Sequence, residues 1–257
     1  AVVMVEHRIH LVKDAVDRVV VMNQGQIVGE GADPLRHVGL GLPLPPIEHP
    51  ATLGRELIAA TGLNYAYDGG DAKALNGVDF RVHAGERIAL MGPNGSGKST
   101  LIRALAGQLN AGSIERSGRI IDVPQDPDLA LFCPTVRDEL AYGAMEHRLK
   151  PDETAERVTR LAEALNLSDL LDRAPQSLSR GQRLRVAVGA AMSVQPDVLL
   201  LDEPTSGQDR NEVARLMRAL SAASETGAVV FATHDEELAQ AAATRIVRMD
   251  AGRVVSE

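Results

Sequence analysis

Cysteine is nearly absent from the 257-residue chain, which contains only Cys133. A single thiol excludes an internal disulfide and a zinc site built from several cysteines, and it is typical of proteins from a reducing compartment. An iron–sulfur cluster is excluded for the same reason. We interpret Cys133 as an ordinary thiol without a metal or redox role.

Aromatic residues are also scarce, with three Tyr, three Phe and no Trp. The hydrophobic core must therefore be built from Ala, Val and Leu, and a surface that stacks on nucleic-acid bases would have few rings available. The formal net charge of −8 works against binding to a phosphate backbone. We therefore do not expect a nucleic-acid partner.

Long apolar runs are missing as well. No run reaches the roughly 18 residues that a membrane-spanning helix needs, and no stretch resembles a signal segment. With 44% apolar and 24% charged residues, the composition is that of an ordinary globular protein. We expect a soluble protein, or one that is peripheral to a membrane.

Proline is concentrated in residues 33–50, which hold five of the thirteen prolines. Proline fixes φ and lacks a backbone donor, so this stretch favours neither a helix nor a central strand. We predict a linker over residues 33–54, which joins residues 1–32 to a domain over residues 55–257.

The larger domain alternates strand and helix patterns. Continuous apolar runs predict buried parallel strands at residues 197–202 and 227–234, and shorter strands are predicted within residues 56–67 and 77–91. Helical spacing is found in residues 99–109, 152–167, 180–194 and 210–224. The fold class is therefore α/β. A further apolar, β-branched run at residues 1–5 predicts one more buried strand.

The chain contains an internal repeat. Residues 1–28 align without a gap with residues 228–255, at an offset of 227, and share 11 identities. The matched pairs include His7 with His234, Met22 with Met249, and Gly25 with Gly252. Two strand–helix–strand units that are alike by chance would not keep one register through all three pairs. We interpret residues 1–32 as the end of a domain similar to the one that follows.

The strongest local motif is GPNGSGKS at residues 92–99, which fits G-x-x-x-x-G-K-[ST] and lies between a predicted strand and a predicted helix. Its glycines let the backbone curl until the N–H groups point at phosphate oxygens, and the following helix adds the positive end of its dipole. Lys98 is placed to reach the β- and γ-phosphates, and Ser99 to hold Mg²⁺ through its hydroxyl. The motif predicts a site for a nucleoside triphosphate.

Two acids follow the apolar run in DVLLLDEPTSGQD. Asp202 ends the predicted strand, where it is placed to bind Mg²⁺ through water. The adjacent Glu203 can orient or deprotonate an attacking water. Together with the glycine loop, this pair predicts phosphate chemistry rather than a solvated turn.

A third motif lies in SLSRGQRLRV. Ser179 and Gln182 form an S-x-x-Q capping box, which predicts a helix N-terminus. A capped helix with Gly181 in its first turn presents free N–H groups and a positive dipole end, and so offers a second anion site. Two anion sites on one chain suggest that two such domains face each other, each closing the nucleotide site of the other.

With these motifs in their order, residues 56–257 resemble the ATP-binding domain of ABC ATPases over their whole length. The matching segments are the glycine loop at 92–100, Gln125 at a strand end, LSRGQ at 178–182, LLLDE at 199–203, SGQD at 206–209, and the strand-end His234. The resemblance implies a P-loop NTPase fold with a mostly parallel core sheet and flanking helices. It also implies a small antiparallel β-subdomain and a helical subdomain that carries LSRGQ.

The resemblance further implies ATP and Mg²⁺ as cofactors, with a role for each matching residue. Glu203 is the implied general base, and His234 is the implied switch that contacts the γ-phosphate. The implied ligands of Mg²⁺ are Ser99, Gln125 and Asp202, and Gln125 also counts among the catalytic residues.

Further matching residues are implied to contact ATP. Tyr67 is implied to stack on adenine. The other residues implied to bind ATP within the same domain are Gly92, Pro93, Asn94, Gly95, Ser96, Gly97, Lys98, Ser99 and Thr100. Those implied to act on the ATP of a partner domain are Ser179, Gly181, Gln182 and Asp209. The residues alone leave open that Tyr67 is an ordinary strand tyrosine and that His234 is only a hydrogen-bonded imidazole at a strand end.

Two positions depart from the family pattern. Arg180 replaces the more usual Gly of the signature, and Gln208 replaces the usual Leu of the SGLD turn. Neither change removes a catalytic group. The segment between the glycine loop and Gln125 is short, so we expect a trimmed β-subdomain.

Residues 123–143, VPQDPDLALFCPTVRDELAYG, resemble those of energy-coupling-factor and cobalt-type importers, whose two ATPase domains occur fused in one polypeptide. The resemblance implies an ATPase subunit of a membrane importer for a vitamin or metal ion, peripheral on the cytoplasmic face of the cell membrane. Its implied partners are a transmembrane subunit, contacted around residues 132–142, and a second ABC domain. That second domain is either another copy or a tandem first domain that ends at residues 1–32. Because the rest of that first domain is absent from this sequence, we expect His7 to contact no nucleotide.

A soluble ABC ATPase acting on ribosomes or DNA is the alternative. Chromosome-organising relatives insert long coiled coils between the glycine loop and Asp202, where only about a hundred residues lie in this chain. Translation-type tandem proteins carry long charged linkers, whereas residues 33–50 are short and rich in proline. A third hypothesis, a module that holds ATP without hydrolysing it, is disfavoured by the presence of both Glu203 and His234.

Overall fold

Runs of consecutive apolar residues form the centre of the fold, as expected for strands with both faces covered. The computed structural model describes residues 2–4, 15–23, 26–30, 54–69, 72–208, 210–224 and 227–256. Within this part of the chain, a core sheet has the strand order β11-β10-β5-β9-β8-β7. The bounds are β11 (Arg253–Ser256), β10 (Arg245–Asp250), β5 (Arg87–Met91), β9 (Ala228–Ala232), β8 (Val198–Asp202) and β7 (Ile120–Val123). Neighbouring strands pair in parallel except β10 and β11, which form an antiparallel hairpin.

Each central strand divides its side chains between two hydrophobic cores, because successive residues point to opposite faces of a sheet. In β5, Ile88 and Leu90 belong to the core on one face, and Ala89 and Met91 belong to the core on the other. The same alternation runs through β8 and β9. The core sheet is therefore the middle layer of the molecule.

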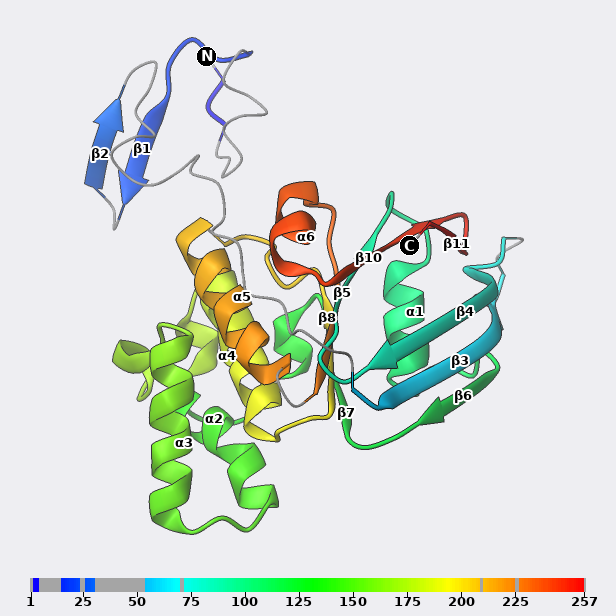
Figure 1. The fold of residues 1–257 in the computed structure, drawn as a ribbon. Helices are drawn as coiled ribbons and strands as arrows, with labels where there is room; N and C mark the ends of the chain where they lie inside the picture. The colour runs from blue at the N-terminus through cyan, green and yellow to red at the C-terminus, as the bar shows by residue number, and fades with distance from the viewer. Residues whose placement is uncertain are drawn as a thin grey trace.

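One face of the core sheet is covered by helix α1 (Lys98–Leu105) and by a second, antiparallel sheet. The strand order of that sheet is β4-β3-β6, with β3 (Glu56–Tyr65), β4 (Leu75–His83) and β6 (Ser113–Arg116). Leu101 and Leu105 of α1 are fully buried with Phe80 of β4 in one core. Figure 1 shows this β-subdomain beside α1, to the right of the core sheet.

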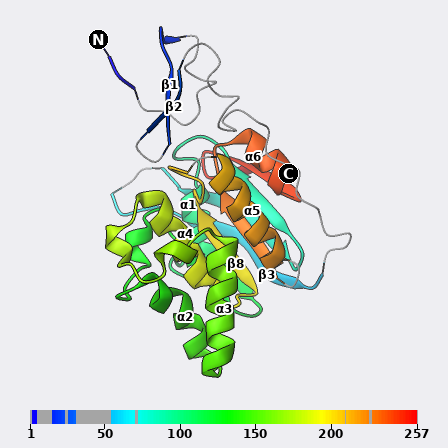
Figure 2. The same cartoon turned by 90° about the vertical axis from the view of Figure 1, so that its left-hand side faces the viewer.

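The other face is covered by helices. They are α2 (Val136–Glu146), α3 (Pro151–Ala164), α4 (Arg180–Ser193), α5 (Arg210–Ser224) and α6 (Glu236–Ala242), with short 3₁₀ turns η4 (Pro127–Leu129), η5 (Ser168–Leu170) and η6 (Pro175–Ser177). Figures 1 and 2 show α2 and α3 extending away from the core sheet as a helical subdomain. None of the described helices is long and apolar enough to cross a membrane.

The predicted fold class is confirmed: the chain has a mostly parallel core sheet, flanking helices, an antiparallel β-subdomain and a helical subdomain that carries residues 178–182. The β-subdomain keeps three strands despite the short segment after the glycine loop. The predicted strand region at residues 77–91 forms two strands, because the chain turns at Gly85 with φ of 90°.

Residues 20–30 contain a two-stranded antiparallel hairpin, β1 (Val20–Asn23) and β2 (Gln26–Glu30). The prediction of a buried strand over residues 1–5 is wrong for residues 2–4, which form no strand, and Val2 is 92% exposed. An extended run is stabilised only when another strand accepts and donates its backbone hydrogen bonds, and no strand in the described part of the chain pairs with these three residues. His7 and residues 33–53 of the predicted linker lie outside the described residues.

Candidate functional site

The predicted site residues gather because parallel strands end at the same edge of a sheet, which is where open α/β sheets bind ligands. Strand β5 ends directly before Gly92, and β7 ends two residues before Gln125. Strand β8 ends at Asp202, and β9 ends two residues before His234. The chemistry-bearing residues of four strands therefore share one edge.

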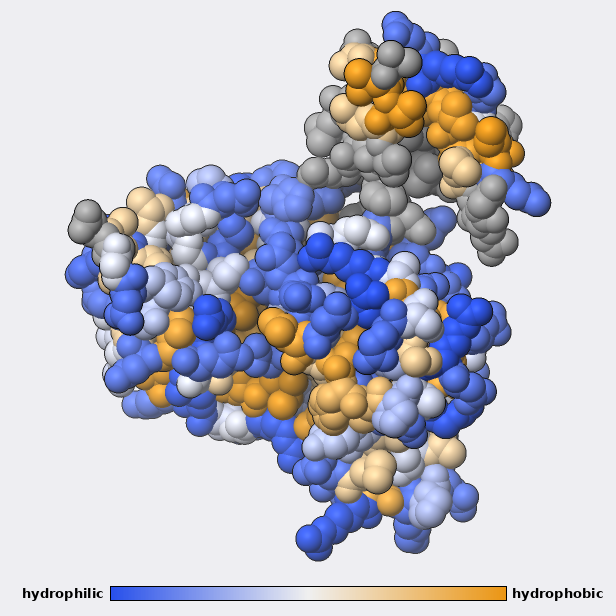
Figure 3. Space-filling view, turned by 180° about the vertical axis from the view of Figure 1, so that it is seen from behind, coloured by the Kyte–Doolittle hydropathy of each residue, from blue (hydrophilic) through white to orange (hydrophobic). Residues whose placement is uncertain are grey.

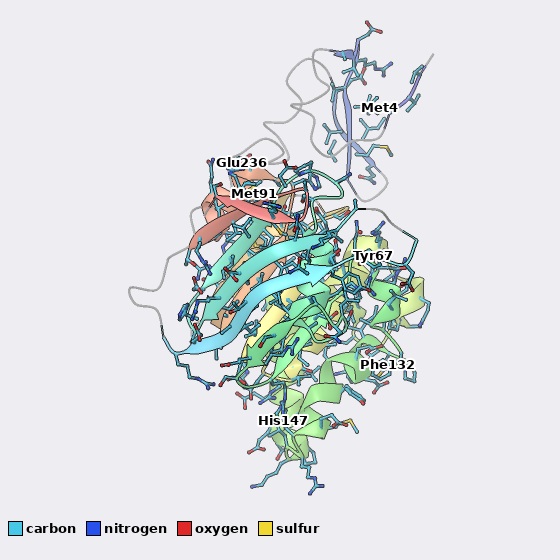
Figure 4. The ribbon with its side chains drawn as sticks, turned by 90° about the vertical axis from the view of Figure 1, so that its right-hand side faces the viewer. Met4, Tyr67, Met91, Phe132, His147 and Glu236 are labelled. Carbon is cyan, nitrogen blue, oxygen red and sulfur yellow. The ribbon has the colours of Figure 1, made fainter. Side chains whose placement is uncertain are left out.

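A cavity of about 390 Å³ lies at this edge. Its size falls within the usual range of ligand pockets, about 300–1,000 Å³. The lining residues are Tyr67, Ala74, Asn94, Gly95, Gly97, Lys98, Ser99, Thr100, Gln125, Asp202 and Glu203. Figure 4 shows Tyr67 just beyond the antiparallel sheet, on the same side of the molecule as Phe132.

The glycine loop needs glycine at its two ends. A Cβ on Gly92, whose φ is 143°, would lie 2.1 Å from the carbonyl oxygen of Met249. A Cβ on Gly97, whose φ is 106°, would lie 2.4 Å from the carbonyl oxygen of Ala74. Gly97 also caps α1 without a side-chain hydrogen bond, and the first turn of α1 contains no acidic residue. The free N–H groups and positive dipole end of this helix fit an anion such as phosphate.

Lys98 lies folded back on the loop that precedes it. Its ammonium group donates to the carbonyl oxygens of Gly92 at 2.8 Å and Pro93 at 3.0 Å, and the residue is 7% exposed. Neutral carbonyls solvate a buried cation only in part, so an incoming anion gains a large attraction. The loop thus holds a cation ready for the phosphates of a nucleotide.

Asp202 is an acidic residue of the cavity that interacts electrostatically with Lys98. Burial raises the pKa of Asp202, while a hydrogen bond from Ser99 and the charge of Lys98 act in the opposite direction. The Ser99 hydroxyl, the Asp202 carboxylate and the Gln125 amide all line the cavity. These are hard oxygen donors of the kind that Mg²⁺ prefers, so the residues present fit a magnesium ion held partly by water and phosphate oxygens.

Glu203 is held in an unusual backbone conformation, with φ of 52°, and its N–H donates to the carbonyl oxygen of Ala232 at 3.2 Å. For a residue other than glycine this conformation costs about 1–3 kcal/mol, and such strain is found at functional sites. The Glu203 carboxylate lies 3.0 Å from Nδ1 of His234, and the two side chains are 14% and 51% exposed. His234 does not line the cavity itself but contacts a residue that does.

Tyr67 is fixed at the mouth of the cavity through its hydroxyl. The hydroxyl lies 3.3 Å from Oγ1 of Thr100 and accepts from Arg103 at 3.3 Å. The ring of Tyr65 meets the Tyr67 ring edge-on, with centroids 5.0 Å apart. Because Tyr67 is still 43% exposed, its ring offers a free surface on which a base can stack.

The N-terminus of α4 forms the predicted capping box. The Ser179 hydroxyl accepts from the N–H of Gln182 at 3.3 Å, and the Gln182 side chain accepts from the N–H of Ser179 at 2.9 Å. A Cβ on Gly181 would lie 3.1 Å from the carbonyl oxygen of Gly207. Arg180, the departure from the family pattern, donates to the carbonyl oxygen of Gln125 at 3.3 Å. None of the residues 179–182 lines the cavity.

The structure thus brings most of the predicted residues together. Gly92, Pro93 and Ser96 belong to the glycine loop without lining the cavity, and Asp209 lies outside the described residues. Two residues of the site were not predicted from the sequence: Ala74, which lines the cavity, and Arg103, which donates to the Tyr67 hydroxyl. No local motif marks Ala74. Arg103 lies four residues after Ser99, and residues with this spacing share one face of a helix, so the predicted helix could have indicated that Arg103 lies near the site.

Comparison with known proteins places the chain in a family. The ABC transporter family profile matches residues 75–206. A putative ABC transporter ATP-binding protein of Methanosarcina mazei is 34% identical and aligns with 100% of this chain and 55% of its own length. The cobalt import ATP-binding protein CbiO of Rhodobacter capsulatus is 40% identical over 78% of each chain. The energy-coupling factor transporter ATP-binding protein EcfA of Methanothermobacter thermautotrophicus is 36% identical over 78% of this chain and 70% of its own.

Among solved structures, cbiO1 of Clostridium perfringens, part of the transporter complex cbiONQ, is 31% identical, with a TM-score of 0.67 over 78% of this chain and 87% of its own. A dimeric ATP-binding cassette in a post-hydrolysis state has a TM-score of 0.70 over 78% of this chain and 97% of its own, at 22% identity, which shows the shared fold. The chain spans 55% and 30% of the lengths of two Methanosarcina relatives. It belongs to the family of ABC transporter ATP-binding proteins.

Proposed function

We propose that the chain binds ATP with Mg²⁺ in the cavity at the sheet edge and hydrolyses it as the ATPase subunit of a membrane importer. The observation that carries this proposal is the convergence of Lys98, Ser99, Gln125, Asp202 and Glu203 on one cavity. Each residue type matches a step of phosphoryl transfer to water, which needs phosphate binding, a metal ion and a positioned nucleophile.

The binding roles follow from the geometry. The backbone N–H groups of the glycine loop and Lys98 hold the phosphates, and Lys98 exchanges its present carbonyl partners for phosphate oxygens. Tyr67 stacks on the adenine ring. Ser99, Asp202 and Gln125 hold Mg²⁺, which, when bound, neutralises charge on the phosphate oxygens.

The catalytic roles fall to Glu203 and His234, which follow β8 and β9. Glu203 orients and deprotonates the attacking water. His234 shares a hydrogen bond with Glu203 through Nδ1, so its Nε2 is free to contact the γ-phosphate. Gln125, which follows β7 and lines the cavity, would contact both the metal ion and the attacking water.

A partner ABC domain completes the site. Ser179, Gly181 and Gln182 do not line the cavity of their own domain, yet they form a capped helix N-terminus suited to a phosphate. We assign these residues, with Asp209, to the nucleotide of the partner domain. The partner is another copy of the chain or a tandem first domain.

The tandem arrangement is supported by the N-terminal hairpin. Strands β1 and β2 pair Val21 with Gly29, Met22 with Ile27 and Asn23 with Gln26. At the offset of 227, β10 and β11 have the same three pairs, and both hairpins shift register at the same point. The whole chain, including residues 1–54, also aligns with the longer Methanosarcina mazei relative. We therefore assign residues 1–32 to the end of a first ABC domain, 33–54 to a linker and 55–257 to the second domain.

Mass determination of the polypeptide as the cell makes it tests the tandem arrangement. A mass about twice the 27.4 kDa of this chain supports a preceding domain of similar size. A mass of 27.4 kDa contradicts it.

A transmembrane subunit docks on an exposed apolar cluster. Leu129, Phe132, Tyr142 and Met145 are 79%, 66%, 42% and 67% exposed. The rings of Phe132 and Tyr142 pack edge-on, with centroids 4.9 Å apart. Figure 3 shows hydrophobic surface gathered on the rear face of the molecule. Exposed apolar patches of this kind mark interaction sites, and the cluster begins four residues after Gln125.

The relative named for cobalt import supports a metal ion as the transported substrate, and the sequence resemblance of residues 123–143 to energy-coupling-factor importers keeps a vitamin as the alternative. A subunit that docks on a transmembrane partner and binds cytoplasmic ATP is peripheral on the cytoplasmic face of the membrane. The names of these relatives favour transport over work on ribosomes or DNA.

Measurement of ATP turnover tests the proposed activity. The chain with its partner domain should release phosphate from ATP in the presence of Mg²⁺, and Glu203→Gln should abolish release while ATP stays bound. Glu236→Gln is the control, because Glu236 of α6 is an exposed carboxylate that forms an ion pair with Arg248 of β10. Loss of ATP binding in Glu203→Gln, or equal turnover in both variants, contradicts the assigned role of Glu203.

A further inference from the structure

The glycine loop lies against the turn between β10 and β11, more than 150 residues away in the chain. We name residues 249–252 of this turn the C-terminal brace. The N–H of Gly252 donates to the carbonyl oxygen of Ser96, in the middle of the glycine loop, at 3.0 Å. The Cα of Gly252 and the Cε of Met249 lie 3.4 and 3.3 Å from the position of a Cβ on Gly97. The brace therefore touches the loop through both backbone and side chain.

The brace also touches the β-subdomain. The carbonyl oxygen of Gly252 accepts from the N–H of Asn76 at 2.8 Å. A Cβ on Gly252 would lie 2.9 Å from the carbonyl oxygen of Lys73 and 3.0 Å from that of Ala74. Ala74 lines the same cavity as Tyr67 and the glycine loop. Gly252 thus links the glycine loop to a second segment that lines the cavity through Ala74.

Only glycine fits at position 252 without a steric clash. Gly252 has φ of 76°, which side chains rarely adopt, and the space where a Cβ would stand is filled by two backbone oxygens that cannot move like a flexible side chain. Met249 is 1% exposed, and its carbonyl oxygen lies against Gly92. The first and last glycines of the loop are therefore both packed on the brace.

The internal repeat preserves the same two residues. Met22 and Gly25 stand where Met249 and Gly252 stand in the later unit. These are the residues of the brace that contact the glycine loop. A role limited to closing a hairpin would need a turn residue, but not this methionine.

We propose that Gly252 and Met249 are positioning residues for ATP binding: the C-terminal brace holds the glycine loop and the Ala74 segment at the spacing that a nucleotide requires. This inference rests on the proposed function of the glycine loop. The phosphate-binding N–H groups must be placed before the nucleotide arrives, because their affinity depends on preorganisation. The brace supplies this placement from outside the cavity.

Two matched substitutions test the brace in the full chain. Gly252→Ala adds a Cβ against Lys73 and Ala74, whereas Gly62→Ala adds a Cβ at a similar φ of 60° with no atom within 4 Å. Both substitutions place alanine at a positive φ, but only Gly252→Ala adds a close contact with the segment that meets the glycine loop. We expect Gly252→Ala, whose Cβ also lowers the melting temperature because the two oxygens must shift, to weaken binding of a fluorescent ATP analogue to the folded protein by about tenfold or more relative to Gly62→Ala. Equal affinity in the two variants overturns the proposal.

A third variant separates backbone conformation from close contact. Asparagine tolerates positive φ better than alanine but still carries a Cβ. Gly252→Asn should therefore bind ATP as weakly as Gly252→Ala. Recovery of the parent affinity by Gly252→Asn overturns the contact argument.

Hydrogen exchange of the unaltered chain gives a measurement that does not depend on any variant folding. Because the Gly252 N–H is bonded to Ser96, ordering of the loop by ATP with Mg²⁺ should slow exchange at Gly252, although this residue does not line the cavity. The Gly62 N–H, bonded to Asp79, should not change. An unchanged exchange rate at Gly252 overturns the brace, whereas failure of the parent chain to bind ATP contradicts the proposed function instead.

Discussion

Glu203 and His234, which follow the neighbouring strands β8 and β9 and are 31 residues apart in the sequence, lie with Oε2 and Nδ1 3.0 Å from each other. Since a carboxylate accepts, Nδ1 of the imidazole carries the proton and Nε2 is left for another partner. The pair joins the proposed base to a group that can reach the γ-phosphate. Two distinct roles for His234 follow, orientation of Glu203 and contact with phosphate.

Substitutions at His234 distinguish the two roles. Asparagine places its amide near the position of Nδ1, and glutamine places its amide near that of Nε2. If phosphate contact dominates, His234→Gln should keep more turnover than His234→Asn, and His234→Ala should lower kcat by about a hundredfold. Steady-state phosphate release with separate kcat and KM values is the measurement. Greater activity in the asparagine variant would assign His234 to orientation of Glu203 instead.

Tyr67 should contribute to ATP affinity through its ring rather than its hydroxyl. Stacking on a base is worth about 1–3 kcal/mol, so Tyr67→Ala should weaken ATP binding by about 5- to 150-fold. Tyr67→Phe loses only the hydrogen bonds to Thr100 and Arg103 and should bind ATP within a few-fold of the parent. Fluorescence titration with ATP measures both. Equal losses in the two variants would show that the hydroxyl, and not the ring, carries the effect.

Phe132 should contribute to binding of the transmembrane subunit and not to binding of ATP. Phe132→Asp places a charge in the exposed cluster with Tyr142, and we expect it to abolish co-purification with the transmembrane subunit while ATP affinity stays unchanged. Val255→Asp is the matched control, since Val255 is 62% exposed, close to the 66% of Phe132, and lies on β11. Retention of the membrane subunit by Phe132→Asp would exclude the cluster as the docking surface.

Cys133 should be an unreactive thiol despite its position beside the docking cluster. Burial, and next the negative charge of Glu139, raise the pKa of the thiol to about 11. A raised pKa means that the thiolate forms only at higher pH, so at pH 8 alkylation should be slower than for a free cysteine and should accelerate up to about pH 11. Glu139→Gln removes the charge and keeps an oxygen for the N–H groups of Phe132 and Cys133, so it should raise the rate at pH 8. Mass spectrometry after iodoacetamide treatment follows the single thiol, and a titration midpoint near 8.5 would contradict the assignment.

Much of the fold was predictable from the sequence because its signals are local. The apolar runs of β8 and β9, the glycine loop and the capping box of Ser179 each specify a short segment by composition and spacing. The site was predictable to the same extent, since each of its motifs directly follows or starts such a segment. Parallel pairing then brings the strand ends together without further information.

The remaining features depend on contacts between distant segments. No sequence pattern near Ala74 or Gly252 predicts that these residues contact the glycine loop. For Gly252, the contact depends on the pairing of β10 with β5. The error at residues 2–4 has the same origin: an apolar, β-branched run indicates a strand, but only a pairing partner makes it one. Local composition cannot supply that partner.

The central claim is that a triphosphate binds against the glycine loop beside Lys98. The most direct measurement is a crystal structure of the Glu203→Gln variant with ATP and Mg²⁺. The account predicts that the Lys98 ammonium leaves the carbonyl oxygens of Gly92 and Pro93 and lies about 2.7–2.9 Å from phosphate oxygens, with Mg²⁺ about 2.1 Å from the Ser99 hydroxyl. A nucleotide bound elsewhere, or Lys98 still bonded to those two carbonyls in the presence of bound ATP, would contradict it.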